Sequence, residues 1–285
     1  MAILVLGSKG MLGRDLVSLL IDKKGEKDIL AWGRSELDIT DKKDTDEKFK
    51  SLNESNKVDV VINCAAYTSV DKAEEEHELA YRVNAIGAKN VARASRTISA
   101  KTVYISTDYV FDGEKAEAYR EDDETNPINY YGYTKLMGEQ FTSQENPDSL
   151  IIRTQWLYGS WGGNFVKTMV ELSKEKDEIR VVNDQWGSPT YTVDLSQAVL
   201  KLLEKGCRGT YHVSNSGSTT WFGFAEEIFK LIDTDVSVIP VSSDEFVRPA
   251  KRPMNSVFNM DKFILDIGCE LRLWEKAIES YIMKR

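Results

Sequence analysis

The sequence predicts an α/β protein, with a Rossmann-type doubly wound parallel sheet followed by a smaller mixed α/β lobe. Residues 3–6 form a continuous apolar run that stops at Gly7, as expected for a strand buried on both faces. From Met11 onward, leucines recur at three- and four-residue steps, which is the period of a helix. Apolar runs and helical patterns then alternate through the first half of the chain. Such alternation is typical of parallel βαβ units.

Four more strands are predicted in the first half of the chain, at residues 29–32, 58–64, 101–106 and 149–153. Helices are predicted between them, notably at residues 71–84 and 85–99. After about residue 151 the alternation becomes irregular, with helices expected at 165–174, 193–205, 221–232 and 273–283 and strands at 179–183 and 209–213. We therefore predict a first domain over residues 1–150 and a smaller lobe over residues 151–285. The helix at 193–205 could pack back on the first domain.

Composition excludes several classes of function. The 285 residues include 37 Lys and Arg against 46 Asp and Glu, and a formal net charge of -9 argues against a nucleic-acid or anionic-membrane surface. No apolar run approaches the roughly 20 residues of a membrane span, and the first residues do not resemble a signal peptide. Three scattered cysteines and two histidines predict neither a disulfide framework nor a metal site. We expect a cytoplasmic protein.

The first strand and helix are joined by a glycine-rich turn. Gly7, Gly10 and Gly13 let the backbone approach a pyrophosphate, while the helix N-terminus faces the anion. The alternative is an ordinary tight turn. Arg34, near the end of the second strand, suits a 2′-phosphate and favours NADPH, although NADH or a simple surface arginine is also compatible. Asp38 comes too late for the ribose and could flank the adenine.

A tyrosine and a lysine spaced four residues apart form a candidate catalytic pair. Tyr131 and Lys135 would share one helix face, and a nearby ammonium would lower the high pKa of the phenol. One such pair is expected by chance, so its context matters. Ser106, Thr107 and Asp108 follow an apolar strand at the sheet edge where ligands bind, and Thr107 could hold a carbonyl oxygen. Turn and cap chemistry is the alternative for this triplet.

Longer motifs span almost the whole chain. They are GSKGMLG (7–13), LDIT (37–40), CAAYTSVDKAE (64–74), VNAIGAKNVA (83–92), YISTDYVFDG (104–113), YGYTKLMGE (131–139), RTQWLYG (153–159), DQWGSPTY (184–191) and RPMNS (252–256). With these motifs the chain resembles the dTDP-4-dehydrorhamnose reductase family of extended short-chain dehydrogenase/reductases. Two positions depart from the family pattern. Met11 stands where glutamine is usual, and Gln155 replaces a small hydroxyl residue before Trp156.

The resemblance implies a role for each matching position. The catalytic residues would be Thr107, Tyr131 and Lys135. The cofactor-binding residues would be Gly7, Lys9, Gly10, Met11, Leu12, Gly13, Arg34, Asp38, Ile39, Ala65, Ala66, Tyr67, Tyr131 and Lys135. The substrate-binding residues would be Thr68, Val70, Asp108, Tyr109, Trp156 and Arg252, the last as a pyrophosphate ligand. Asn84 matches a supporting asparagine. The segment 248–253 is either a surface loop or a lid.

The leading hypothesis is an NADPH-dependent reductase of the C4 ketone of a nucleotide-diphosphate 4-keto-6-deoxy sugar, in cell-surface polysaccharide biosynthesis. The first domain would bind the cofactor and the second lobe the sugar nucleotide. One alternative keeps the three catalytic residues but reduces or epimerises another keto sugar, such as a UDP-linked N-acetyl sugar. Another is a non-catalytic, NADP-binding regulatory subunit. The partner is the sugar nucleotide, with no metal, nucleic acid or membrane, and a homodimer is compatible with the sequence.

Overall fold

The computed structural model describes residues 1–55 and 57–284, and six strands within them form one parallel sheet. The strands lie in the order β2-β1-β3-β4-β5-β10. Their bounds are β1 Ile3–Leu6, β2 Ile29–Trp32, β3 Val60–Asn63, β4 Lys101–Thr107, β5 Ser149–Thr154 and β10 Gly209–His212. The order reverses between β1 and β3, where doubly wound sheets bind their ligands. The predicted doubly wound sheet is confirmed.

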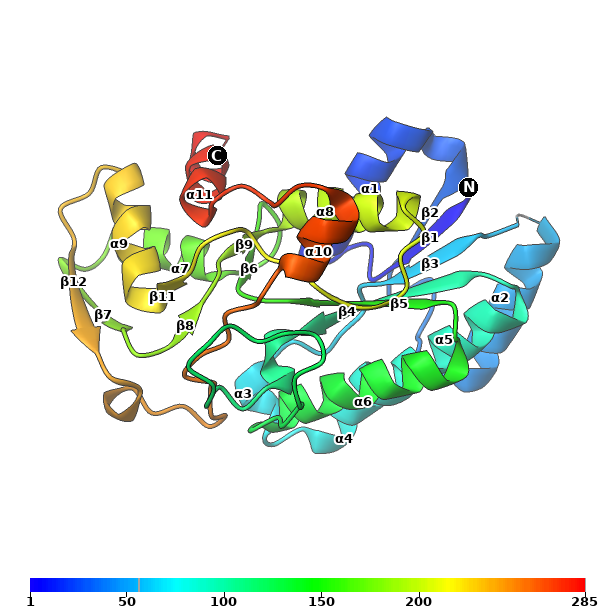
Figure 1. Cartoon of the computed structure of the whole chain (residues 1–285), viewed down its shortest axis with the longest axis horizontal. Coiled ribbons are helices and arrows are strands. Elements are labelled where there is room, and N and C mark those ends of the chain that lie inside the picture. Colours follow the sequence, from blue (N-terminus) through cyan, green and yellow to red (C-terminus); the bar gives the residue numbers. More distant parts are fainter. Residues whose placement is uncertain (56, 285) are drawn as a thin grey trace.

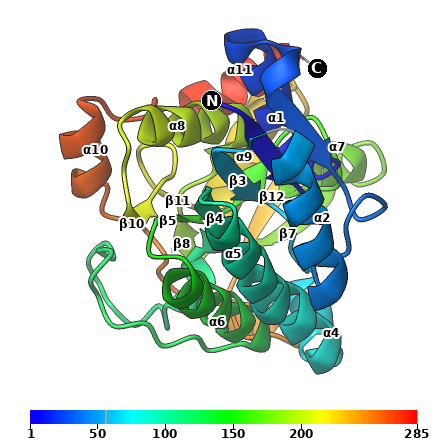
Figure 2. The same cartoon turned by 90° about the vertical axis from the view of Figure 1, so that its right-hand side faces the viewer.

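Helices cover both faces of the sheet, which explains the uninterrupted apolar sequence of β1 (Figure 1). Ile3 and Val5 belong to a core shared with α1 (Met11–Lys24) and α8 (Thr192–Glu204). Leu4 and Leu6 belong to a second core, shared with α2 (Lys42–Ser55) and α5 (Ala88–Thr97). The long helix α6 (Tyr130–Glu145) packs beside α5. Figure 2 shows α1 and α8 on one side of the sheet and α5 and α6 on the other.

Two elements from the second half of the chain return to this sheet. Helix α8 packs against α1, and its leucines join the same core as β1. Strand β10 pairs with β5, so the strand near 209–213 lies in the main sheet and not in the second lobe, where the sequence placed it. Burial of apolar side chains explains this placement, because Tyr211 and Val213 lie in the hydrophobic core that includes the leucines of α8. The predicted boundary between the two domains, at residues 150/151, stays a prediction. Strand β5 spans this position in the structure.

The rest of the second half builds a separate hydrophobic core. Phe224, Ile228, Trp274 and Ile278 are fully or almost fully buried in it. Its helices are α7 Phe165–Leu172, α9 Trp221–Leu231 and α11 Trp274–Met283, and a short helix, α10 Asp261–Ile267, lies against β10. Its strands pair in twos, β7 Glu178–Val182 with β12 Ser237–Val241, β6 Leu157–Tyr158 with β9 Thr190–Tyr191, and β8 Trp186–Gly187 with β11 Thr219–Thr220.

The helices predicted at 71–84 and 85–99 are arranged differently in the structure. Two short helices, α3 (Val70–Ala73) and α4 (His77–Tyr81), are separated by a turn at the acidic run 74–76. A π-helical segment, Arg82–Gly87, then leads into α5. The acidic run therefore forms a turn and not a helix face, although Glu75 and Glu76 are exposed to solvent. Glu74 turns inward, and its Oε1 accepts a 2.7 Å hydrogen bond from the backbone N–H of Tyr130 at the start of α6.

Within the described residues, no helix is both long and apolar enough to cross a membrane.

The packing of α8 on α1 predicts a large effect on stability. Leu195 has no exposed surface and lies in the shared core, so Leu195→Ala should lower the free energy of unfolding by about 2–5 kcal/mol in urea denaturation. Leu265→Ala is the matched control because Leu265 is 84% exposed, and its effect should stay within about 0.5 kcal/mol. Equal effects of the two substitutions would contradict this account of the core.

Candidate active site

The glycine turn brings the start of α1 against the end of β3. Gly7 has a φ of 71°, and a Cβ there would lie 2.6 Å from the backbone nitrogen of Ala65. A Cβ on Gly13 would collide with the carbonyl oxygen of Gly7. Gly10 caps α1 without any side-chain bond, so the first N–H groups of the helix remain available to an anion. The turn therefore has the shape and the polarity of a phosphate cradle.

A cavity of about 320 Å³ extends from this turn over the ends of β1, β2 and β3. Many of the predicted cofactor residues line it, namely Gly7, Lys9, Gly10, Arg34, Asp38, Ile39, Ala65, Ala66 and Tyr67. A second cavity of about 490 Å³ lies beyond the turn. Its lining includes Gly10, Met11, Leu12, Gly13, Ala66, Thr68, Val70, Thr107, Asp108, Tyr109, Tyr131, Lys135 and Trp156. We call these the dinucleotide cavity and the catalytic cavity; Gly10, Cys64 and Ala66 belong to both.

Charged groups at the rim of the dinucleotide cavity pair with one another. Arg34 is largely exposed and lies 3.7 Å from Asp38. Burial favours a higher pKa for Asp38, but hydrogen bonds from Thr40 outweigh it and hold that pKa below its usual value. Lys9 Nζ lies 3.0 Å from Glu36, and this bond is the main reason that the pKa of Glu36 falls to about 2. Sequence analysis missed Glu36, because an exposed glutamate carries no local sign of its partner.

The first turn of α6 places Tyr131 and Lys135 beside the end of β4. The Asn129 side chain caps the helix by accepting a 2.7 Å bond from the Gly132 N–H. A Cβ on Gly132 would collide with the carbonyl oxygen of Tyr109, so glycine allows α6 to approach the turn after β4. Thr107, Tyr131 and Lys135, predicted separately from a strand end and a helix face, thus line one cavity.

Lys135 is almost completely buried and faces the sheet. Its Nζ donates a 2.6 Å hydrogen bond to the carbonyl oxygen of Ile105 and lies 4.1 Å from the ring centroid of Tyr104. Burial lowers the pKa of Lys135 to about 7, against the opposing charge of Glu139. The expected lowering of the Tyr131 pKa by Lys135 is not found. Burial raises the pKa of Tyr131, and a hydrogen bond with Thr107 opposes the rise only in part.

Asp108 is a buried carboxyl at the base of the catalytic cavity. Its Oδ1 accepts a 2.9 Å hydrogen bond from the hydroxyl of Thr107. Burial raises the pKa of Asp108 to about 6, while hydrogen bonds from Ser256 and Thr107 lower it. The carboxyl is therefore mainly ionised at neutral pH and sensitive to acidification. It also lies close enough to Tyr131 for its charge to raise the tyrosine pKa.

Trp156 lies in a strained backbone position, with a φ of 46°. Its ring stacks on Trp221 with the centroids 3.6 Å apart, and a Cβ on Gly187 would lie 2.5 Å from the indole. One face of Trp156 is therefore covered by protein, and stacking of a sugar on that face is excluded. Trp221 lines the same cavity and has no sequence signal that separates it from a core aromatic.

Arg252 lies in the segment 248–253, contacts Asp71 of α3 and is not among the residues lining the two cavities described above. Its guanidinium binds Asp71 through two contacts of 2.9 and 3.0 Å, and Asp71 follows the cavity residue Val70. Arg248 lies 3.7 Å from the same carboxylate. The predicted pyrophosphate ligand is thus close to the cavity but is engaged by an acidic partner.

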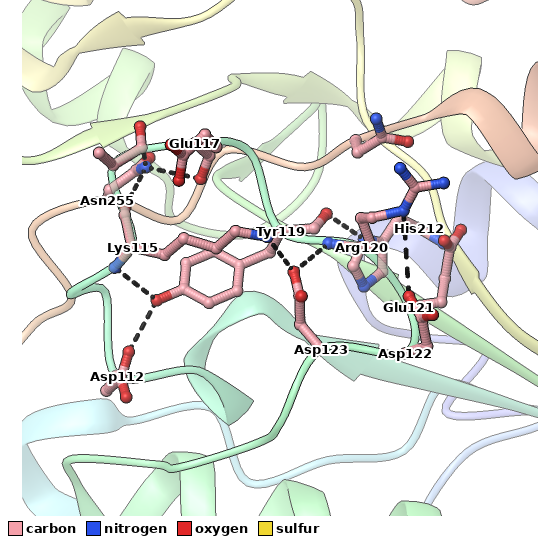
Figure 3. Close-up of polar contacts among 12 residues, drawn as sticks. Asp112, Lys115, Glu117, Tyr119, Arg120, Glu121, Asp122, Asp123, His212 and Asn255 are labelled. Carbon is pink, nitrogen blue, oxygen red and sulfur yellow. Dashed lines mark hydrogen bonds and ion pairs between the residues drawn. The ribbon is translucent and has the colours of Figure 1, made fainter.

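A buried ion pair links α6 to strand β5 of the main sheet. Arg153 of β5 and Glu139 of α6 form two bonds of 2.9 and 2.8 Å, and both side chains are almost fully buried. The loop between β4 and α6 is held by its own contacts, including Lys115 to Asp123 at 2.6 Å (Figure 3). His212 lies in the same region, and burial, together with the nearby charge of Arg153, lowers its pKa well below the usual value. None of these residues was predicted from sequence.

No group of His, Cys, Asp and Glu side chains within residues 1–55 and 57–284 is arranged to hold a metal ion.

The fold and the site together define an oxidoreductase of the extended short-chain dehydrogenase/reductase class. The chain belongs to the family described as "RmlD substrate binding domain", whose model matches residues 1–285.

Individual relatives match over most or all of their lengths. The chain is 42% identical to a dTDP-4-dehydrorhamnose reductase of Streptomyces griseus, over 98% of this chain and 92% of that one. It is similar to the crystal structure of a dTDP-4-dehydrorhamnose reductase from Clostridium acetobutylicum, with a TM-score of 0.94, 46% identity and coverage of 100% and 99%. A Bacillus anthracis dTDP-4-dehydrorhamnose reductase in complex with NADP gives a TM-score of 0.95, 43% identity and full coverage of both chains.

The buried lysine predicts a specific pH dependence of stability. Because burial lowers the folded pKa of Lys135 to about 7, from about 10.4 for an exposed lysine, the unfolded chain binds more protons between these values. The free energy of unfolding should therefore rise with pH in this window, by at most about 1.4 kcal/mol per unit. The penalty is complete below pH 7 and absent above about pH 10.

Lys135→Met removes this titration and leaves the other groups in place. Urea denaturation of both proteins at pH 7, 8 and 9 should show the wild type gaining stability relative to the variant as pH rises. Parallel stability curves would contradict the assignment of a depressed pKa to Lys135.

Proposed function

We propose that the protein uses NADPH to reduce the C4 ketone of a nucleotide-diphosphate 4-keto-6-deoxyhexose, most specifically dTDP-4-dehydrorhamnose to dTDP-L-rhamnose. The observation that carries this proposal is the junction of two cavities at the glycine turn. One side presents a phosphate cradle, and the other presents Thr107, Tyr131 and Lys135. The names of the relatives support the substrate, and the NADP complex of one of them supports the cofactor.

The cradle residues fit a dinucleotide. Side chains at Gly7 and Gly13 would fill the space against the backbone, and the uncapped start of α1 offers N–H groups to the pyrophosphate. Arg34 would bind a 2′-phosphate, with Lys9, Asp38 and Ile39 around the adenosine and Ala65, Ala66 and Tyr67 along the phosphates and ribose. NADPH supplies the hydride when it is bound.

Tyr131 would supply the proton that the reduced carbonyl oxygen requires. The buried phenol keeps its proton at neutral pH, because burial raises its pKa, and it is therefore available as an acid. Thr107 would orient the substrate oxygen next to Tyr131. Lys135, with a pKa of about 7, would stabilise the phenolate left after proton transfer and contact the nicotinamide ribose.

The sugar would lie against the remaining lining of the catalytic cavity. It would be surrounded by Asp108, Tyr109, Thr68 and Val70. Trp156 would contact it through the edge of the indole ring. Arg252 would bind the pyrophosphate after exchanging Asp71 for the phosphate oxygens, since a guanidinium forms paired bonds to either anion. The names of the relatives favour net reduction over redox-neutral epimerisation or a regulatory role. A homodimer, polysaccharide biosynthesis and a cytoplasmic location remain proposals.

Removal of one hydroxyl tests the proton donor. Tyr131→Phe should lower kcat with dTDP-4-dehydrorhamnose by about 100- to 10,000-fold, because the variant has no proton to give. NADPH oxidation followed at 340 nm measures the rate, and fluorescence titration measures NADPH affinity, which should stay within about threefold. Tyr133→Phe is the control, since Tyr133 lies in the same helix but is exposed. Full activity of Tyr131→Phe would contradict the mechanism.

A further inference from the structure

The wall of the catalytic cavity contains an unusual concentration of unsatisfied polar atoms. Six buried side-chain polar atoms in the described residues have no hydrogen-bond partner, and four of them belong to this wall. The four are Ser106 Oγ, Asp108 Oδ2, Thr154 Oγ1 and Gln155 Nε2. A buried unpaired group costs about 1–3 kcal/mol, so such groups are normally paired. Their clustering around one cavity indicates a ligand with several polar groups.

Gln155 is the member of this set with a fixed orientation. Its side-chain Oε1 accepts a 2.9 Å hydrogen bond from the backbone N–H of Ser188, which can only donate. The hydroxyl of Ser256 donates to the same oxygen at 3.3 Å. The Nε2 group is therefore the free end of the amide, and neither of its N–H groups has an acceptor. Gln155 is only 2% exposed, so solvent does not replace the missing partner.

A complementary acceptor lines the same cavity. Asp108 is a lining residue like Gln155, and its carboxylate oxygen Oδ2 is also buried without a partner. An unpaired donor and an unpaired acceptor thus belong to the wall of one cavity. A hydroxyl group can accept from an amide and donate to a carboxylate at the same time. Sugars present such hydroxyl groups, whereas apolar ligands do not.

We propose that Gln155 is a specificity-determining residue, whose amide N–H donates to a ring hydroxyl of the sugar while Asp108 accepts from that hydroxyl. This assignment rests on the proposed function. A 4-keto-6-deoxyhexose attached through C1 retains only the C2 and C3 hydroxyls, so one of these two is the partner. The residue thereby selects sugars with that hydroxyl. The position is one at which the chain departs from its family pattern, and the proposal gives this departure a chemical role.

The experiment compares Gln155→Met with the wild type on three substrates: the parent dTDP-4-keto-6-deoxyhexose and its 2-deoxy and 3-deoxy analogues. Methionine has similar length but no donor. We expect kcat/KM for the parent sugar to fall by about 10- to 100-fold, mainly through KM, because an uncharged hydrogen bond to a buried group is lost. On one deoxy analogue the two proteins should differ by less than about threefold. Gln155→Glu, which keeps the length but cannot donate when ionised, should show the same pattern.

Gln185→Met is the matched control. Gln185 is also buried in this half of the chain, but its amide Nε2 already donates to Ser243 at 2.8 Å and lies outside the catalytic cavity. Its substitution should change kcat/KM by a similar small factor on all three sugars. NADPH affinity should stay within about twofold in every variant, which separates sugar recognition from cofactor binding.

Two results would overturn the assignment. An equal loss on all three sugars would make Gln155 a structural residue, and no loss on the parent sugar would remove its role altogether. A wild type that oxidises no NADPH with the parent sugar would instead contradict the proposed function, and the assignment of Gln155 would fall with it. Selective loss with an active wild type supports both.

Discussion

The contact between the glycine turn and the end of β3 is the constraint on which the rest of the site depends. Gly7 lies against the backbone at Ala65, and Gly13 lies against the carbonyl of Gly7, so that no side chain separates α1 from the sheet edge. The dinucleotide and catalytic cavities consequently share a wall at Gly10, Cys64 and Ala66. A group bound to the turn can reach across this wall, and a bulkier turn would separate the cofactor from the reacting carbonyl.

Local charges, and not the net charge, determine the chemistry at this wall. The chain carries a formal charge of -9, yet it presents a helix N-terminus, Lys9 and Arg34 to one cavity and a buried Lys135 to the other. Lys135 is held by a hydrogen bond from its Nζ to the Ile105 carbonyl oxygen and by a cation–π contact with the Tyr104 ring. The Glu139–Arg153 pair holds the same helix against β5. Exposed charges that lie more than a Debye length, about 8–10 Å, from this wall are largely screened by salt.

Sequence reasoning recovered the features that have a local signature. The apolar run at β1, the three glycines and the Tyr131–Lys135 spacing predicted the sheet, the turn and the helix face that lines the second cavity. The return of β10 to the main sheet, the turn at Glu74 and the stacking of Trp221 on Trp156 were missed. Each depends on a partner distant in sequence, and neither periodicity nor composition specifies such a partner. The prediction of a lowered pKa for Tyr131 was also wrong. Helix spacing predicts a neighbouring ammonium, but it does not show how deeply the phenol is buried, and burial dominates the pKa.

In this arrangement a hydride passes from the cofactor held at the glycine turn to the sugar carbonyl in the adjoining cavity. Incubation of the wild type with dTDP-4-dehydrorhamnose and NADPH deuterated at the transferable C4 position tests this transfer. One NADPH should be consumed for each sugar reduced, with deuterium bonded to C4 of the product in the NMR spectrum. Turnover without NADPH consumption, or a reduced sugar that lacks deuterium at C4, would contradict it.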